Sequence, residues 1–402
     1  MFYNVSMDSL NQLNLLSSEM RFEADAEQIN ASPVVDACSR VDDIHIHPAV
    51  MPNGKRVRLL KTLLSSACER DCFYCPFRAK RDFKRATFKP EAFAKLFMQL
   101  HHAKLVDGLF ISSGLAGGGV RTQQQLLDAA EILRGKMAYT GYLHMKIMPG
   151  AEKGQVLRSM QLSDRVSVNL EAPNRSRLAK LAPRKVFWDE LLQPLRWVEE
   201  IRRTQPAPQQ PWRFDYGEKD ASAQRGRWAS STTQFVAGGA DESDLELLSM
   251  TARGYSDLGL ARTYFMAFSP VPDTPLENKS PTPKLRELRL YQASFLLRDY
   301  GFDLEELPFA TDGDLPLSTD PKIAWAEINL KEMPVEVNTA SPRELLRVPG
   351  IGTKLAEKIV AARRQKKLSD LSQLKKLGVL TERAAPYLLL NTRRPAHQNR
   401  LF

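Results

Sequence analysis

The sequence predicts an α/β protein in two parts: a partial (β/α)6 barrel of the TIM type, followed by a small all-α domain built from two helical hairpins. Three observations lead to this prediction. Short apolar segments alternate six times with amphipathic segments between residues 57 and 300. Three cysteines stand together directly after the first apolar segment. The last fifth of the chain carries most of the net positive charge of +10.

Length and composition agree with an enzyme that carries an accessory module. A chain of 402 residues exceeds the usual size of one domain, and its hydrophobic fraction of 43% supports more than one core. No run of eighteen apolar residues predicts a membrane span, and the amino-terminal segment lacks the features of a secretion signal. Four cysteines, three of them in one motif, fit a reducing compartment, so we expect a cytoplasmic protein.

Six apolar segments rich in β-forming residues are expected to be parallel strands. They are Val57–Leu64, Gly108–Ser113, Tyr142–Met148, Arg165–Glu171, Thr232–Val236 and Arg262–Phe268. The amphipathic segments between and after them are expected to be helices. These are Pro90–Leu105, Gln123–Lys136, Glu152–Leu162, Trp188–Arg203, Asp241–Leu258 and Pro283–Tyr300. In barrels of this type the reactions occur at the carboxyl ends of the strands.

The three clustered cysteines directly follow the first strand, at its carboxyl end. Cys68, Cys72 and Cys75 have the spacing that lets three thiolates hold one face of a cubane iron–sulfur cluster and leave the fourth iron open. The alternatives are a zinc site and a disulfide. Structural zinc requires four ligands, whereas Cys38 is the only other cysteine, and spacings this short would give strained disulfide loops.

This cysteine loop, with an aromatic residue just before its last cysteine, resembles the signature of the radical S-adenosylmethionine (SAM) superfamily. The resemblance implies that Cys68, Cys72 and Cys75 hold a 4Fe-4S cluster, and that the cluster binds SAM and cleaves it reductively to methionine and a 5′-deoxyadenosyl radical. It also implies a low-potential electron donor such as flavodoxin or ferredoxin. Tyr74 would then lie beside the adenine of SAM, although a packed aromatic is the alternative.

The same resemblance assigns SAM contacts to the ends of later strands. Ser113 and Gly114 belong to a glycine-rich segment that would receive the SAM amino group, although this chain lacks the acid that the superfamily often carries there. A plain tight turn is the alternative. The remaining candidates are Lys146, Asn169, Glu171 and Gly238. Lys146 and Glu171 could instead pair with each other in the interior.

A wider resemblance, to the DNA modification or repair branch of the superfamily, covers most of the chain. It includes the strand ends at Ser112–Gly114, Lys146–Gly150 and Asn169–Pro173, the segment Phe268–Pro275, and the carboxyl-terminal module. The segment Thr204–Ser231 departs from that pattern and is expected to be an inserted loop. It is either a surface excursion or a place where Trp212, Tyr216 and Trp228, interleaved with arginines, stack on bases.

The carboxyl-terminal segment is similar to a tandem helix-hairpin-helix. Ser341 and Glu344 form a predicted capping box, and the chain turns at Pro349 to Gly352 before a second helix over 353–365. The turn would leave backbone N–H groups free to bind a phosphate oxygen. The residues expected to contact DNA are Gly350, Ile351, Gly352, Thr353, Lys354 and Lys358.

A weaker second copy has predicted helices over 371–377 and 381–390, with Leu380 where a glycine would be expected, so we expect it to serve packing. From Lys331 onward the chain has fifteen basic and six acidic residues, a net charge of +9. This favours backbone contacts to duplex DNA over a protein-docking module.

Five regions follow from these patterns. They are an extension over 1–45, the barrel over 46–305 with its insert at 204–231, a linker over 306–330, the hairpins over 331–392 and a basic tail over 393–402. The functional hypothesis is a radical SAM enzyme that modifies or repairs nucleic acid, with DNA as the expected polymer and with no catalytic residue singled out. The alternatives are modification of transfer RNA or protein, and a redox-sensing DNA-binding protein that catalyses nothing.

Overall fold

The computed structural model describes residues 7–18, 20, 39–41, 44–50, 56–209 and 226–396 of the 402-residue chain. The chain divides into two compact units, residues 1–242 with 253–282 and residues 243–252 with 283–402. Helix α8 (Asp244–Asp257) is shared between them. Among the described helices, none combines the length and the apolar composition that a bilayer crossing requires.

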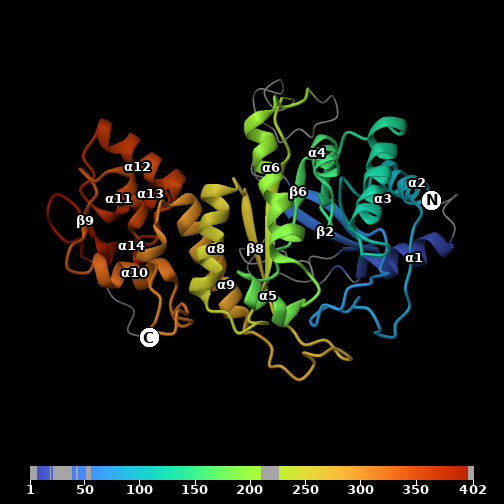
Figure 1. Cartoon of the computed structure of the whole chain (residues 1–402). Coiled ribbons are helices and arrows are strands. Elements are labelled where there is room, and N and C mark those ends of the chain that lie inside the picture. Colours follow the sequence, from blue (N-terminus) through green and yellow to red (C-terminus); the bar gives the residue numbers. More distant parts are fainter. Residues whose placement is uncertain are drawn as a thin grey trace. The chain divides into compact units, whose positions relative to one another are not determined.

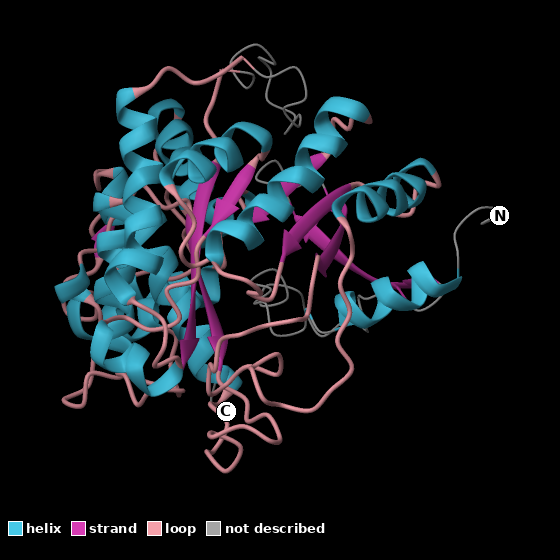
Figure 2. Ribbon diagram, turned by 45° about the vertical axis from the view of Figure 1, so that its right-hand side comes forward, coloured by secondary structure: helices cyan, strands magenta, loops and turns pink. Residues whose placement is uncertain are grey.

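The first unit is built on one curled, eight-stranded sheet, whose strands Figure 2 draws in magenta. Its strands are β1 (Ser39–Val41), β2 (Ile44–Val50), β3 (Arg56–Leu63), β4 (Gly108–Ser112), β5 (Tyr142–Lys146), β6 (Arg165–Ser167), β7 (Ser230–Ala237) and β8 (Arg262–Ala267). They follow one another in sequence order, so the sheet is open between β1 and β8. The strands β3 to β8 are parallel, which confirms the predicted α/β class and its six repeats.

Helices connect the parallel strands. They are α2 (Pro90–His102), α3 (Gly119–Glu131), α4 (Lys153–Leu162), α5 (Arg175–Leu181) and α6 (Gln193–Thr204), with π-helical turns at Ile132–Lys136 and Phe187–Leu192. The amino-terminal α1 (Met7–Ser18) packs against β2 and β3. Neighbouring helices α2, α3, α4 and α6 pack side by side on one face of the sheet (Figure 1).

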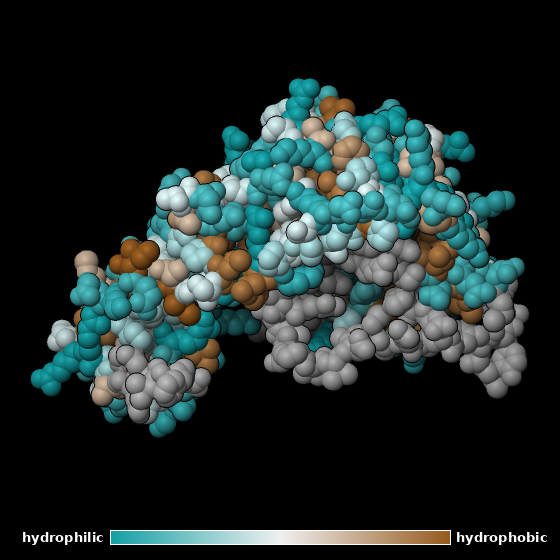
Figure 3. Space-filling view, turned by 90° about the horizontal axis from the view of Figure 1, so that it is seen from below, coloured by the Kyte–Doolittle hydropathy of each residue, from teal (hydrophilic) through white to brown (hydrophobic). Residues whose placement is uncertain are grey.

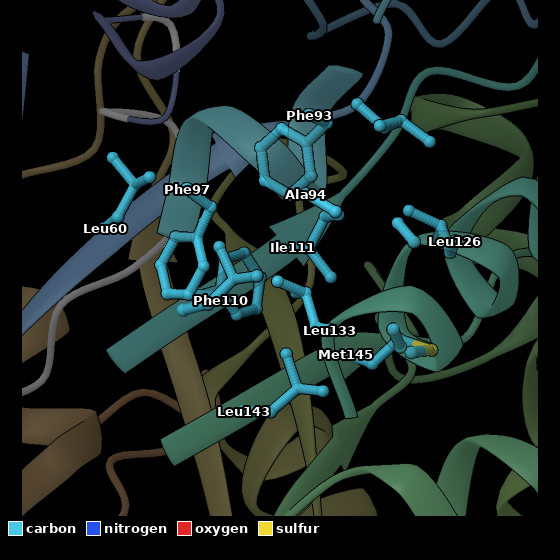
Figure 4. Packing of buried hydrophobic residues seen from close by; sticks show 14 of the residues in the cluster. Leu60, Phe93, Ala94, Phe97, Phe110, Ile111, Leu126, Leu133, Leu143 and Met145 are labelled. Carbon is cyan, nitrogen blue, oxygen red and sulfur yellow. The ribbon is translucent and has the colours of Figure 1, made fainter. Parts of the chain in front are cut away.

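The core of this unit lies between that face of the sheet and the helices. Phe93 and Phe97 of α2 are fully buried against strand residues such as Ile111, Leu143 and Met145 (Figure 4). Burying one such side chain contributes roughly 1.5–3 kcal/mol. The strand positions that face the helices are therefore apolar, and the alternate positions point to the opposite, concave face.

A buried ion pair ties the amino ends of β5 and β6 together. Arg134 contacts Asp164 at 3.1 Å, and both side chains are inaccessible to solvent. The guanidinium also donates to the carbonyls of Tyr139, Gly141 and Leu162, while the carboxylate accepts the N–H of Leu143. Because the guanidinium makes hydrogen bonds to three carbonyls as well as to the carboxylate, the pair can fix the connections at this end of the sheet without leaving an unpaired buried charge.

The second unit is helical, and Figure 1 draws it in orange to red. It contains α9 (Lys284–Asp299), α10 (Pro321–Asn329), α11 (Pro342–Arg347), α12 (Thr353–Gln365), α13 (Leu371–Lys376) and α14 (Thr381–Ala384), with the short strands β9 (Val335–Glu336) and β10 (Leu388–Leu389). The predicted helices over 353–365 and 371–377 are present. Residues 321–329, which the sequence assigned to a linker, form α10, and Ala326 and Leu330 lie in the hydrophobic core of the hairpin module.

Two other elements differ from the predictions. Strand β2 was not predicted, because Pro48 interrupts its apolar pattern, yet the strand pairs antiparallel with β3 as the second strand of the sheet. The helix predicted over 381–390 ends at Ala384. Pro386 disfavours further helical turns, and the chain continues into β10, which pairs with β9.

The surface seen from below in Figure 3 is mostly hydrophilic, and its apolar residues form small separate patches. The exposed apolar side chains include Ile328, Met333 and Leu380 of the helical unit. Single exposed apolar residues are ordinary on protein surfaces.

Candidate functional site

A pocket with an empty volume of about 960 Å³ opens at the carboxyl ends of β3 to β7. All three motif cysteines, Cys68, Cys72 and Cys75, line it, and none of them forms a disulfide. The cysteine loop therefore forms one wall of this pocket.

Backbone hydrogen bonds and one arginine fix the cysteine loop. The N–H of Phe73 donates to the carbonyl of Leu181 at 2.7 Å. The guanidinium of Arg85 donates to the carbonyls of Ser66 at 2.9 Å and Phe77 at 3.2 Å, and further to that of Arg78 at 3.0 Å. Since these bonds span both sides of the motif, the loop does not depend on the cysteines for its shape.

Gly114 lets the segment after β4 pass directly against the cysteine loop. Its N–H donates to the carbonyl of Ser65 at 2.6 Å. A Cβ atom at this position would stand 2.3 Å from the carbonyl oxygen of Ala67, the residue before the first cysteine. Only glycine allows this approach between two backbones. The predicted glycine-rich strand end is thus a close-contact site next to the cysteines.

Glu69 of the cysteine loop joins the glycine-rich segment a second time. Its carboxylate accepts the N–H groups of Gly117 at 3.1 Å and Gly118 at 3.2 Å. Its own N–H donates to the carbonyl of Leu115 at 2.7 Å. The side chain and backbone of Glu69 therefore hold the cysteine loop against the glycine-rich segment.

The environment of the cysteines controls their ionisation. Burial raises the pKa of the Cys72 thiol, with Lys185 opposing that rise. Burial also raises the pKa of Cys75, and the neighbouring Cys72 adds to the effect. Within the described residues, no three His, Cys, Asp or Glu side chains converge on the position of a single metal ion.

Glu171 occupies a strained position at the rim of the pocket. Its φ of 64° is uncommon for a residue other than glycine, and such strain concentrates at functional sites. One carboxylate oxygen accepts a hydrogen bond from Lys185 Nζ at 2.9 Å, so the partner of Glu171 is Lys185 and not Lys146. Burial and the charge of Glu171 raise the pKa of Tyr74, whose ring lines the same pocket.

Most of the predicted SAM contacts come together around this pocket. Its lining includes Tyr74, Ser113, Gly114, Lys146, Asn169 and Glu171. Gly238 does not line it. The N–H of Gly238 donates to the carboxylate of Glu242, and a Cβ atom there would overlap the hydroxyl of Thr282.

Sequence analysis missed three polar residues that line the pocket: Arg70, Lys185 and Gln234. Gln234 stands near the end of a predicted strand, as Asn169 does, and that position was the available signal. Lys185 lies in a loop after α5 with no pattern of its own. Parts of the predicted insert, including Trp212 and Tyr216, as well as Cys38, lie outside the described residues.

The hairpin turn between α11 and α12 is a second candidate site. Gly350 has a φ of 84°, and a Cβ there would stand 2.9 Å from the carbonyl oxygen of Leu380. Ser341 and Glu344 form the predicted capping box. The N-cap Gly352 offers no side chain to the first N–H groups of α12, and Thr353, Lys354 and Lys358 are exposed beside them. The second hairpin contributes Leu374, Val379 and Ala384 to the hydrophobic core of the module, as expected of a hairpin that serves packing, while Leu380 itself is 58% exposed.

Two buried cations support this turn from behind. Lys322 of α10 donates to the carbonyl of Ile351 at 2.7 Å and lies 4.5 Å from the ring centre of Tyr300. Burial lowers the pKa of Lys322 to about 7, and the charges of Arg383 and Arg347 act in the same direction. The guanidinium of Arg347 stacks 3.6 Å from the ring centre of Phe302. These two side chains support the turn from the interior of the unit.

Comparison with known proteins gives one family match. The model of the helix-hairpin-helix motif matches residues 331–386, which contain α11 to α14. No curated protein matches the chain.

Among solved structures, methylornithine synthase is 15% identical over 61% of this chain and 64% of its own, with a TM-score of 0.43. The FeFe-hydrogenase maturase HydG from Carboxydothermus hydrogenoformans is 12% identical over 60% of this chain and 51% of its own, with a TM-score of 0.42. A radical SAM methyltransferase from Sphaerobacter thermophilus is 15% identical over 65% of this chain and 73% of its own, with a TM-score of 0.42. The chain spans less than two-thirds of the length of the first two.

Replacing Gly114 with alanine should destabilise the first unit, because the added Cβ would meet a backbone oxygen at 2.3 Å. We expect the free energy of unfolding to fall by roughly 1–3 kcal/mol, the usual cost of overpacking. Gly154→Ala is the matched control, because a Cβ at Gly154 of α4 meets nothing within 4 Å. Urea denaturation of both variants measures the difference, and equal stabilities would contradict the close approach.

Replacing Lys322 with methionine should flatten the pH dependence of stability. The folded protein loses the Lys322 proton above about pH 7, whereas the unfolded chain keeps it up to the usual lysine pKa of about 10.4. Between these values the unfolded state binds more protons, so the wild type gains stability as the pH rises. Lys322→Met should lose this gain.

The control for that experiment is Lys331→Met, because Lys331 is a well-exposed lysine of the same unit. Its variant should follow the wild type in urea titrations from about pH 6 to about pH 10. If the free energy of unfolding changed with pH equally in the two lysine variants, burial of Lys322 would not be the cause of the gain in stability of the wild type.

Proposed function

We propose that this chain is a radical SAM enzyme that acts on nucleic acid, and that the nucleic acid is DNA. The observation that carries the proposal is the convergence of Cys68, Cys72 and Cys75 on one pocket at the carboxyl ends of parallel strands. Three thiols at spacings of three and two residues suit a cubane cluster with one open iron better than a structural zinc ion, which takes four ligands.

The residues of the pocket fit a 4Fe-4S cluster and SAM. The three cysteines would hold the cluster, and a positive cluster core would offset the burial that raises the pKa of Cys72 and Cys75. When bound, the cluster supplies the electron that cleaves SAM to methionine and a 5′-deoxyadenosyl radical. Ser113, Gly114, Lys146, Asn169 and Glu171 would surround SAM, with Tyr74 beside its adenine; Gly238 stays a prediction.

The other residues of the site orient the groups that would bind the ligand and exclude water from the pocket. Lys185 holds the Glu171 carboxylate in one direction, so that this acid can accept hydrogen bonds from a ligand. Arg85 and Gly114 keep the cysteine loop close to the glycine-rich segment. Leu63, Ile147 and Val168 contribute apolar wall, which limits the water that could quench a reactive ligand.

The nucleic-acid part of the proposal is supported by the hairpin module. The matched helix-hairpin-helix motif, the uncapped start of α12 and the exposed Lys354 and Lys358 together suit a phosphate of the DNA backbone. Such contacts position an enzyme without selecting a sequence. A target base in a duplex would have to leave its stack to reach a pocket of this kind.

Two alternatives remain distinguishable. Transfer RNA or protein as substrate would leave the pocket chemistry unchanged, and the polymer that stimulates formation of 5′-deoxyadenosine decides between them. A redox-sensing DNA-binding protein would hold the cluster without cleaving SAM. The strand-end residues that line the pocket beyond the cysteines favour an enzyme, since a sensor needs no such lining.

Anaerobic reconstitution with iron and sulfide tests the metal centre. Cys68→Ala, Cys72→Ala and Cys75→Ala should each lose the cluster, because two thiols are too few to hold it. Cys38→Ala is the matched control and should keep the full iron and sulfide content. The electron spin resonance spectrum of the reduced protein should change on addition of SAM. A fully loaded protein whose spectrum ignores SAM would contradict the proposal.

Duplex-DNA titrations over a range of salt concentrations test the hairpin. The double variant Lys354→Gln, Lys358→Gln should bind more weakly and show a salt slope smaller by about one per lost phosphate contact. Lys153→Gln removes one positive charge at an exposed lysine of the other unit and should behave as the wild type. Unchanged affinity in the double variant would remove the hairpin from the proposed DNA site.

A further inference from the structure

The helical unit buries a lysine that has no acidic partner. Lys322 of α10 is only 8% exposed, and it forms no ion pair with any described residue. Its ammonium group has three donors, but among the described residues only the carbonyl of Ile351 accepts one of them, at 2.7 Å. A buried charge without a counter-ion costs free energy, so an apolar side chain would serve stability better here. This cost indicates that Lys322 has a role other than stability.

The groups that surround Lys322 come from four elements. Burial lowers the pKa of Lys322 to about 7. Asp320, the N-cap of α10, opposes this shift, whereas Arg383 of α14 and Arg347 of α11 add to it. The Asp320 carboxylate is itself engaged, because it caps α10 and lies 3.8 Å from the guanidinium of Arg383. Tyr300, at the end of α9, places the centre of its ring 4.5 Å from Lys322 Nζ.

The hydrogen bond from Lys322 determines the direction in which the hairpin turn presents a backbone donor. Ile351 and Gly352 are joined by a trans peptide bond. In such a bond the carbonyl and the following N–H point in opposite directions. Because Lys322 holds the Ile351 carbonyl on the inner side of the turn, the N–H of Gly352 points to the outer side. Among the described residues that N–H has no acceptor, and Gly352 is partly exposed.

The same hydrogen bond couples the charge of Lys322 to the strength of that donor. A cation that binds a peptide carbonyl polarises the peptide group, so the N–H at its other end becomes a better donor. An anion at the Gly352 N–H in turn stabilises the charged form of Lys322, because the two charges attract each other through a poorly hydrated region. An anion therefore binds more tightly when Lys322 is protonated, and its binding raises the affinity of Lys322 for the proton.

Tyr300 brings a hydroxyl to the same turn. A Cβ atom on Gly352 would lie 3.3 Å from the Tyr300 hydroxyl oxygen. Among the described residues this hydroxyl has no hydrogen-bond partner. Burial raises the pKa of Tyr300, so the hydroxyl keeps its proton at neutral pH and can donate it. The turn thus presents a phenol O–H beside the outward-pointing N–H of Gly352.

We propose that Lys322 and Tyr300 belong to the phosphate site of the hairpin: Lys322 is a positioning residue that orients and polarises the Gly352 N–H, and the Tyr300 hydroxyl binds the phosphate directly. Both residues precede the segment 331–386 that matches the helix-hairpin-helix motif, so the site extends beyond the motif. This inference rests on the proposed binding of DNA through the hairpin and deepens it. It makes the affinity for DNA depend on pH.

The test of Lys322 is the affinity of the full chain for duplex DNA, measured by fluorescence anisotropy at constant salt from about pH 6 to about pH 9. The phosphodiesters of DNA keep their charge over this range, whereas free Lys322 loses its proton above about pH 7. Because the complex holds this proton more tightly, the affinity of the wild type should fall roughly three- to tenfold as the pH rises. Lys322→Met should bind weakly throughout and should show little dependence on pH.

Lys331→Met is the matched control, because it replaces an exposed lysine of the same unit in the same way. Its variant should keep the pH dependence of the wild type. Urea denaturation of each variant at both ends of the pH range separates loss of binding from loss of folding. An equal dependence of affinity on pH in the wild type and in Lys322→Met would overturn the role of Lys322.

Tyr300→Phe tests the hydroxyl without disturbing the ring beside Lys322. The variant should bind duplex DNA roughly tenfold more weakly, because a hydrogen bond to a charged group is lost. The slope of its affinity against salt should equal that of the wild type, because no positive charge is removed. Its stability should not fall, since the hydroxyl has no partner among the described residues.

Tyr255→Phe is the matched control for this variant. The hydroxyl of Tyr255 also has no partner among the described residues, but Tyr255 belongs to the other unit. Its variant should bind DNA as the wild type does. Equal affinities of Tyr300→Phe and Tyr255→Phe would overturn the role of Tyr300.

The outcomes also separate this inference from the proposed function. A wild-type chain that failed to bind duplex DNA would contradict the proposed function and this inference with it. Binding that is weakened by the double variant Lys354→Gln, Lys358→Gln but unchanged by Lys322→Met and by Tyr300→Phe would overturn this inference alone. The hairpin would then hold DNA through the residues of the motif only.

Discussion

The pocket depends on the contact between two backbones, where the segment after β4 runs against the loop that carries the cysteines. Gly114 approaches Ala67 more closely than a residue with a Cβ atom could. The hydrogen bond from its N–H to the carbonyl of Ser65 fixes the position of one segment along the other. Glu69 then fastens the loop to Gly117 and Gly118. The positions of the three thiols follow from this contact, because the motif begins one residue beyond it.

The same chain uses backbone groups at both candidate sites. At the cysteine loop, the N–H groups of the glycine-rich segment are occupied by a carboxylate of the protein itself. At the hairpin, the first turn of α12 has no such cap, and the buried side chains of Lys322 and Arg347 support the turn from behind. The uncapped N–H groups at the start of α12 leave that position open to an anion, whereas a carboxylate cap closes it.

Much of the fold could be predicted because its signals are local. The six parallel strands and the capping box at Ser341 follow from short patterns of residue types. Strand β2 was not predicted because Pro48 interrupts its apolar pattern, and the strand is identified only by its pairing with β3. For the site, the cysteines and the strand-end residues were visible as motifs. Lys185, which pairs with Glu171, was not, because it reaches the pocket through a loop whose sequence has no distinctive pattern.

The order of the strands has a consequence for biosynthesis. The pocket joins Cys68 to Gln234, and the strand that carries Gln234 is synthesised last among those that line it. At the usual rates of translation, the cysteines are synthesised on the order of 10 to 30 seconds before the strand that carries Gln234. During this interval their thiols are open to oxygen and to stray metals. A cell that makes this protein must therefore keep the nascent chain reduced until the last strand pairs.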